Sequence, residues 1–245
     1  MKKIQYIIIS LFSFALLASC KPELKKFSYE TIVIDSTYDS DIDPDNQAFL
    51  NKYKSQLDSA MNRVIATTAV DLDKGKPQSL LSNYTADILV KAGKEKAQKP
   101  ISIAIMNNGG LRASINKGDV TVGDVFKVFP FENELVVLSL SGKDVIELFN
   151  RMAAIGGEGL AGCELVIKDN KVQSLKIDGR PVDPNGEYWV STIDYLADGN
   201  SDMSVLLNAK ERINVGILLR DIMLEYVEQD SVMESELDNR VVVKK

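Results

Sequence analysis

Apolar residues recur along the chain at two spacings, one typical of strands and the other of helices. Short apolar runs bounded by turn residues predict strands at 29–34, 64–70, 101–106, 134–140, 163–167, 172–177, 188–192 and 241–243. Apolar residues three and four positions apart predict helices at 43–61, 78–90 and 215–227, and after Thr121 and Ser141. Because strands and helices do not alternate strictly, the pattern indicates an α+β fold, a mixed β-sheet with packed helices.

Three of the predicted helices begin with capping signals. Asp43 precedes a proline at the first helical position, and Thr121 and Ser141 are each followed three residues later by an aspartate. We expect the helix that begins at Asp43 to bury one apolar side, formed by Phe49, Leu50, Tyr53 and Leu57.

The first residues have the organisation of an export signal. Lys2 and Lys3 precede an apolar run over 4–17, which is too short for a permanent membrane helix. The run ends in small residues and Cys20, which resembles the lipobox of bacterial lipoproteins. We therefore expect a signal peptide at 1–19 and lipid attachment at Cys20. A plain secretory signal with an incidental cysteine is the alternative.

On this interpretation the protein is exported and lipid-anchored to a bacterial membrane, at the periplasmic face or the cell surface. Residues 20–26 would form a polar tether, and 27–245 a single domain. Removing the two signal-peptide lysines takes the formal charge from −6 to −8, so nucleic acid is an unfavourable partner.

The chain contains no histidine. Ser-His-Asp, Cys-His and histidine-metal chemistry are therefore excluded, and we assign no catalytic and no metal-binding residue. Cys163 is the second of two cysteines, and we expect it to be buried and inert.

A candidate binding loop follows the predicted strand at 101–106. Gly109 and Gly110 permit close backbone approach, Asn107 offers a donor and an acceptor, and Arg112 offers a planar fork for phosphate or carboxylate. Taken alone, the loop is equally consistent with a surface turn and a solvated arginine.

A second candidate segment is the aromatic pair Phe129 and Phe131, which surrounds a proline and precedes Asn133 and a predicted strand. Aromatic faces beside a pocket can stack a base. Taken alone, packing in the core is the more common role of such a pair.

Together these segments resemble the C-terminal domain of the 5'-nucleotidase and UDP-sugar hydrolase family. The family motifs N-x-G-G-[IL]-R, G-x-[IV]-T, P-F-x-N, L-x-G, Y-x-V-x-T and Y-L-A stand in the same order at 107–112, 118–121, 130–133, 140–142, 188–192 and 195–197. The resemblance covers roughly 29–206.

The resemblance implies a nucleotide whose base lies between Phe131 and Tyr195, with Asn107 and Arg112 on the sugar and phosphate side. Stacking contributes about 1 to 3 kcal/mol per base. The full expected substrate-binding set is Asn107, Gly109, Gly110, Arg112, Phe131, Asn133, Tyr195, Ser201 and Asp202.

Two positions depart from the family pattern. The family aspartate that contacts the ribose falls on Ser201, and Asp202 would replace it only if the loop shifts. A second family arginine falls on Gly75, which leaves Lys74 or Lys76 as replacements, and lysine supplies charge without the planar fork.

Full-length members of the family carry a metallophosphatase domain whose two metal ions activate water. This chain lacks the histidines and the length for such a domain, so we expect it to be inactive alone, with no cofactor of its own and divalent metals in a partner. One hypothesis is therefore a nucleotide-recognition component that works with a separately encoded metallophosphatase chain. The alternatives are a stand-alone nucleotide- or nucleoside-binding lipoprotein and a degenerate structural protein.

Overall fold

The computed structural model describes residues 29–33, 35, 37 and 43–244. The predicted signal peptide, Cys20 and the tether lie outside the described residues. The chain divides into two compact units, 1–50 and 51–245. In the first unit, 29–33 have no regular secondary structure and are exposed, so the described part of the strand predicted at 29–34 is not a strand. An apolar run forms a strand only where a neighbouring strand completes its hydrogen bonds.

Helix α2 spans Pro44–Met61, as the capping signal predicts. Asp43 Oδ1 accepts hydrogen bonds from the backbone N–H groups of Asp45 at 2.8 Å and Asn46 at 3.2 Å. The prediction that this helix buries an apolar side is wrong, because α2 contains no buried residue. Spacing determines which apolar residues share a side of a helix, but it does not determine what covers that side. The four residues of that side, all more than half exposed, are Phe49, Leu50, Tyr53 and Leu57.

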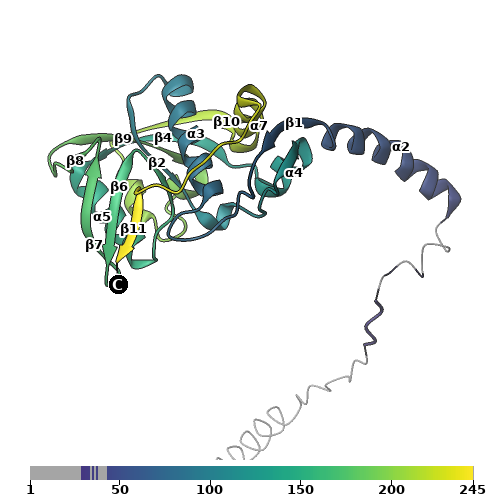
Figure 1. Cartoon of the computed structure of the whole chain (residues 1–245), viewed down its shortest axis with the longest axis horizontal. Helices are drawn as coiled ribbons and strands as arrows, with labels where there is room; N and C mark the ends of the chain where they lie inside the picture. The colour runs from purple at the N-terminus through teal and green to yellow at the C-terminus, as the bar shows by residue number, and fades with distance from the viewer. Residues whose placement is uncertain (1–28, 34, 36, 38–42, 245) are drawn as a thin grey trace, which may run out of the picture. The chain divides into compact units, whose positions relative to one another are not determined.

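A five-stranded mixed sheet forms the centre of the second unit, in the order β10-β4-β9-β2-β5 (Figure 1). Strand β2 pairs with β9 in parallel, and the other three pairings are antiparallel. The predicted α+β class with a mixed sheet is thereby confirmed. The strands are β2 (Ile101–Met106), β4 (Glu134–Ser141), β5 (Gly159–Ala161), β9 (Glu187–Ile193) and β10 (Glu211–Leu218).

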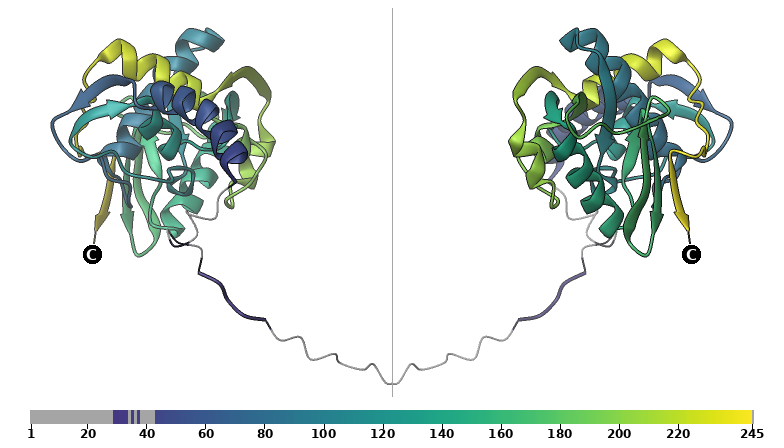
Figure 2. Two further views of the ribbon diagram at one scale, coloured as in Figure 1. Left: turned by 90° about the vertical axis from the view of Figure 1, so that its right-hand side faces the viewer. Right: turned by 90° about the vertical axis from the view of Figure 1, so that its left-hand side faces the viewer.

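Helices cover this sheet. Helix α3 (Leu80–Ala97) packs on β2 and β5, and α5 (Gly142–Ala154) packs on β4 and β9. Every residue of β4 between its two ends is buried, as expected for a strand covered on both faces. Helix α7 (Leu219–Asp230) contacts β10 and α3, and Figure 2 shows α3 and α7 together at one end of the unit.

A four-stranded sheet, in the order β11-β6-β7-β8, packs against α5. The predicted hairpin joins β6 to β7, where Asp169 and Asn170 have φ of 51° and 58°. Such left-handed conformations are typical of tight hairpin turns. The strands are β6 (Cys163–Lys168), β7 (Lys171–Ile177), β8 (Arg180–Pro181) and β11 (Val241–Lys244).

The second unit also contains several short strands and helices outside the two larger sheets. Strand β1 (Val64–Thr68) pairs antiparallel with β3 (Gly118–Thr121), and α4 (Val122–Val128) follows β3 directly. The short helix α6 (Asp194–Ala197) follows β9. Among the described residues, no helix combines the length and the apolar character that crossing a bilayer requires.

The predicted helix at 215–227 begins later than expected. Residues 215–218 belong to β10, and α7 begins at Leu219. The pairing of β10 with β4 shifts register between Asn214 and Leu218, and Gly216 in this stretch has a φ of 73°. Ile213, Val215 and Ile217 alternate with other residues, so the strand period was present beside the helical one.

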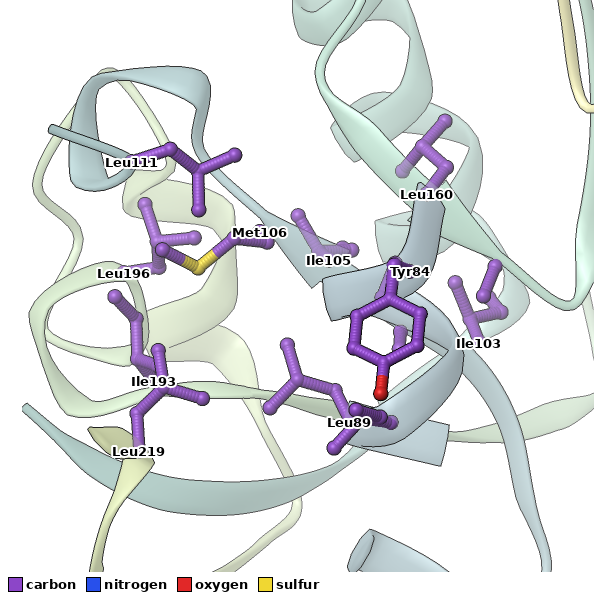
Figure 3. Close-up of a cluster of buried hydrophobic side chains, with 14 of the residues drawn as sticks. Tyr84, Leu89, Ile103, Ile105, Met106, Leu111, Leu160, Ile193, Leu196 and Leu219 are labelled. Atoms are coloured by element: carbon purple, nitrogen blue, oxygen red, sulfur yellow. The ribbon is translucent and has the colours of Figure 1, made fainter. Parts of the chain in front are cut away.

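Buried apolar residues anchor the ends of the central strands. Met106 at the end of β2, Leu111 in the following loop, and Ile193 and Leu196 around the end of β9 are at most 1% exposed. Figure 3 shows these four side chains in the same part of the core. The polar residues next to them in sequence are therefore attached to a rigid support.

Candidate functional site

A pocket of about 370 Å³ lies at one edge of the central sheet. Because β4 runs antiparallel to β9 while β2 runs parallel to it, the start of β4 and the ends of β9 and β2 meet at this edge. The volume lies within the range of small-molecule sites, about 300 to 1,000 Å³. The lining residues are Asn107, Gly109, Gly110, Arg112, Phe131, Asn133, Ile193, Tyr195 and Ser201.

The sequence predicted all but one of these lining residues. Ile193, the last residue of β9, was missed, although its place directly before the Y-L-A motif is a usable signal. Of the two candidates in the loop after α6, Ser201 lines the pocket and Asp202 does not. The backbone carbonyl of Asp202 accepts a hydrogen bond from Arg151 at 3.0 Å.

The glycine loop presents an amide whose oxygen has no partner. Asn107 is 6% exposed, and no described donor lies within hydrogen-bonding distance of its Oδ1. A Cβ on Gly110 would lie 2.9 Å from this oxygen, so glycine is needed there for the Asn107 side chain to keep its place. A buried acceptor without a donor favours a ligand that supplies an N–H or O–H group.

Glu158 holds the glycine loop through hydrogen bonds with Asn108. Its Oε2 accepts hydrogen bonds from the backbone N–H of Asn108 at 2.6 Å and from the Asn108 side chain at 3.0 Å. Lys76 pairs with the same carboxylate at 3.3 Å. The side chain of Glu158 is 7% exposed, so this is a buried support for the loop. Sequence reasoning missed Glu158 because it lies outside every motif.

The two lysines beside Gly75 donate hydrogen bonds to backbone carbonyls. Lys74 donates a hydrogen bond to the backbone carbonyl of Leu111 at 3.0 Å, and Lys76 donates one to the carbonyl of Ile155 at 2.9 Å. Neither lysine lines the pocket. Their charges therefore stabilise the loop rather than extend the lining.

The two phenylalanines around Pro130 have different environments. Phe129 is buried in the core, whereas Phe131 is 49% exposed and lines the pocket. Tyr195, from α6, is 41% exposed and lines the same pocket. The guanidinium carbon of Arg112 lies 5.7 Å from the centroid of the Phe131 ring, within the range of a cation–π contact. Two exposed aromatic residues and one guanidinium group thus line the same pocket.

The segment that carries Phe131 is held by contacts with α7. The guanidinium of Arg220 lies 4.4 Å from the centroid of the Phe126 ring and donates to the backbone carbonyls of Phe129 and Pro130, at 3.3 and 3.4 Å. The backbone N–H of Leu219 donates to the carbonyl of Asn133 at 2.7 Å. These contacts fix the backbone and leave the Phe131 ring free to meet a ligand.

The groups in the pocket can stack, donate and accept hydrogen bonds, and neutralise an anion. Across the described residues, no group of three or more histidine, cysteine, aspartate or glutamate side chains lies close enough to hold a metal ion. Cys163 is buried away from the pocket, and this burial raises the pKa of its thiol to about 12.

Comparison with known proteins identifies similar chains. The family model of the 5'-nucleotidase C-terminal domain matches residues 64–208, which include every residue of the pocket lining. Protein UshA of Salmonella pullorum is 30% identical over 192 residues, which cover 76% of this chain and 34% of that protein. The 5'-nucleotidase of Vibrio vulnificus is 24% identical over 232 residues, which cover 86% of this chain and 42% of that protein.

Among solved structures, the 5'-nucleotidase precursor from Thermus thermophilus superimposes with a TM-score of 0.71 at 27% identity. The match covers 80% of this chain and 42% of the Thermus chain. The chain therefore spans less than half the length of each of these three proteins.

Proposed function

The chain belongs to the family of 5'-nucleotidase C-terminal domains, and on this basis we propose that it is the nucleotide-recognition component of a 5'-nucleotidase-type phosphate-ester hydrolase. One observation carries the proposal. Three of the six family motifs, at 107–112, 130–133 and 195–197, contribute residues to one pocket, in which two aromatic residues, Phe131 and Tyr195, remain exposed together with Arg112. Large aromatic side chains at a pocket are a suitable surface for a planar base.

In the proposed complex the base stacks between Phe131 and Tyr195. Arg112 neutralises the phosphate end, and Asn107 accepts a hydrogen bond from the ligand through its unpartnered oxygen. Ser201 supplies a hydroxyl to the lining. Compared with this hydroxyl, the family aspartate at the same position would repel phosphate and bind ribose hydroxyls more strongly.

We propose that hydrolysis is supplied by a separately encoded metallophosphatase chain that carries the divalent metals. The chain has no histidine, the most common ligand of zinc-like metals. The proposed export signal and lipid attachment at Cys20 would place both chains at a bacterial membrane, on the periplasmic face or the cell surface.

A direct titration tests the binding part of the proposal. The full chain, purified in detergent, is titrated calorimetrically with AMP and adenosine. Phe131→Ala is expected to weaken both ligands about tenfold or more, which corresponds to a stacking loss within about 1 to 3 kcal/mol. Arg112→Ala is expected to weaken AMP more than adenosine, because the guanidinium meets the phosphate end.

Two matched variants control for general effects. Tyr53, an exposed aromatic residue, and Arg180, an exposed arginine, do not line the pocket. Their alanine variants should bind as the wild type does. Absence of binding at millimolar nucleotide would overturn the assignment and favour a structural role. Equal binding in all four variants would overturn the assignment of the nucleotide to this pocket.

Reconstitution tests the partner. An exported metallophosphatase chain from the same source is mixed with the full chain, and phosphate release from AMP is measured with each alone and with both. We expect release only from the pair, and expect Phe131→Ala to raise its KM. Nucleotide binding without release from any such pair would instead support a stand-alone nucleotide-binding lipoprotein.

A further inference from the structure

Asp194 connects the two walls of the pocket through one carboxylate oxygen. Its Oδ1 accepts a hydrogen bond from the side-chain amide of Asn133 at 2.8 Å and from the backbone N–H of Tyr195 at 2.7 Å. Asn133 and Phe131 belong to the segment 130–133, called here the Phe131 wall, and Tyr195 belongs to the start of α6, called here the Tyr195 wall; both segments contribute residues to the pocket lining. The two bonded residues lie 195 − 133 = 62 positions apart in sequence.

These bonds continue the connection between two strands beyond the last residues that pair. In the antiparallel pairing of β4 with β9, the final pair on this side is Leu135 with Ile193. Asn133 and Tyr195 lie past this pair, where no ladder hydrogen bond fixes their separation. The hydrogen bond from Asn133 to the carboxylate of Asp194 therefore connects the two segments beyond the end of the β4–β9 pairing.

The carboxylate also fixes how the Asn133 amide is turned. An ionised aspartate accepts but does not donate, so the Nδ2 of Asn133 must face Asp194. The Oδ1 of Asn133 is then left as an acceptor at the pocket lining.

Other contacts support each wall separately. The Phe131 wall is held by Arg220 and by the backbone N–H of Leu219. The Tyr195 wall is held by Asn200, whose side chain donates to the Tyr195 carbonyl at 2.9 Å. Asp194 differs from these supports because it bonds to both walls.

We propose that Asp194 is a positioning residue that sets the separation of the Phe131 and Tyr195 rings and the orientation of Asn133. This inference rests on the proposed binding of a base between the two rings. Asp194 does not line the pocket, so it acts on the ligand through Asn133 and Tyr195.

The test compares Asp194→Ala and Asp194→Asn in the full chain. Losing both bonds in Asp194→Ala should weaken adenosine binding about tenfold, about 1.4 kcal/mol. The asparagine variant keeps an acceptor oxygen, so it should bind within about threefold of the wild type. Rescue by asparagine separates hydrogen-bond positioning from a loss of charge.

A double-mutant cycle identifies the route of the effect. If Asp194 acts through Asn133, adding Asp194→Ala to Asn133→Ala should weaken binding by less than about threefold. Additive effects of the two substitutions would overturn the coupling. If the alanine variant is poorly folded, Asp194→Asn is tested alone, and binding of adenosine weakened by more than about threefold in that variant would refute positioning through an accepted hydrogen bond.

Asp144 provides a matched control. Its Oδ1 accepts a hydrogen bond from the side-chain amide of Asn208 at 2.8 Å, and it does not line the pocket. Asp144→Ala should lower the melting temperature but leave the Kd of adenosine within about twofold of the wild type. If it weakens binding as much as Asp194→Ala does, the effect is one of general stability and the positioning role is refuted.

The outcomes also separate this inference from the proposed function. Absence of adenosine binding in the wild type contradicts both. Loss of binding in Phe131→Ala together with unchanged binding in Asp194→Ala leaves the base site intact and refutes Asp194 as its positioning residue.

Discussion

Replacing Glu158 by leucine tests how far the glycine loop depends on one buried carboxylate. The substitution removes the acceptor of two hydrogen bonds from Asn108, at 2.6 and 3.0 Å. A buried donor left without an acceptor costs about 1 to 3 kcal/mol. Asn108 is half-buried, so the lower part of this range applies to each bond. The pair with Lys76 adds little, about 0 to 1 kcal/mol, because the lysine side chain is 40% exposed.

We therefore expect Glu158→Leu to lower the free energy of unfolding by about 2 to 3 kcal/mol. The measurement is urea unfolding of the full chain in detergent, followed by circular dichroism. Because the loop presents Asn107 and Arg112, the same variant should also bind AMP more weakly in the calorimetric titration.

Two comparisons make the result decisive. Glu158→Gln keeps an acceptor oxygen for the Asn108 N–H, so it should lose only about 1 kcal/mol. Glu164 forms an exposed pair with Lys176 at 3.7 Å, and Glu164→Leu should change stability by less than about 0.5 kcal/mol. If Glu158→Leu were as stable as Glu164→Leu, solvent would satisfy Asn108 and the reasoning would be wrong.

Three further predictions follow from the local geometry. Gly110→Ala should cost about 1 to 3 kcal/mol and weaken nucleotide binding, because its Cβ would lie 2.5 Å from the Met106 methyl and 2.9 Å from Asn107 Oδ1. Gly109→Ala, whose nearest contact would be at 3.4 Å, should change the free energy of unfolding little. The thiol of Cys163, with its pKa raised to about 12 by burial, should resist iodoacetamide in the folded chain and react in denaturant, as peptide mass analysis will show. Burial raises the pKa of Asp124, but hydrogen bonds from Thr121 and Lys127 outweigh this effect and hold the pKa below its usual value. The stability that this aspartate contributes is present above its unfolded pKa and is lost as the pH falls through its lowered folded-state pKa. Between about pH 5 and about pH 2 the wild type should therefore lose more free energy of unfolding than Asp124→Asn.

The sequence predicted the pocket lining well because motif residues lie directly beside strands. Residues 107–112 follow β2, 130–133 precede β4, and Tyr195 follows β9 by two positions. Apolar spacing predicts the strands, and the ends of adjacent strands carry their flanking loops to one edge of the sheet. Reading the motifs together was necessary, since Phe129 and Phe131 look alike in sequence and only one lines the pocket.

The supports of the pocket were not predictable in the same way. Glu158 reaches the glycine loop from 50 positions further along the chain, and Arg220 reaches the Phe129 carbonyl from 91 positions further along. Neither residue belongs to a motif or to an apolar period. Local spacing contains no information about which distant carboxylate or guanidinium meets a loop, because that is determined by the order of strands in the sheet.

The register of β4 against β9 determines why Asp194 in particular can connect the two walls. Leu135 pairs with Ile193, and this register places Asn133, two residues before Leu135, within hydrogen-bonding distance of Asp194, which follows Ile193. A shift of one residue would turn each side chain of β9 to the other face of the sheet, removing Ile193 from the lining and turning Asp194 away from Asn133. Buried hydrogen bonds of β9 oppose such a shift, because the Ser191 hydroxyl donates to the carbonyl of Leu89 at 2.7 Å and the Thr192 hydroxyl donates to that of Ile105 at 2.9 Å. The buried contacts of β9 thus fix the register that brings Asp194 to Asn133, although Asp194 belongs to no motif.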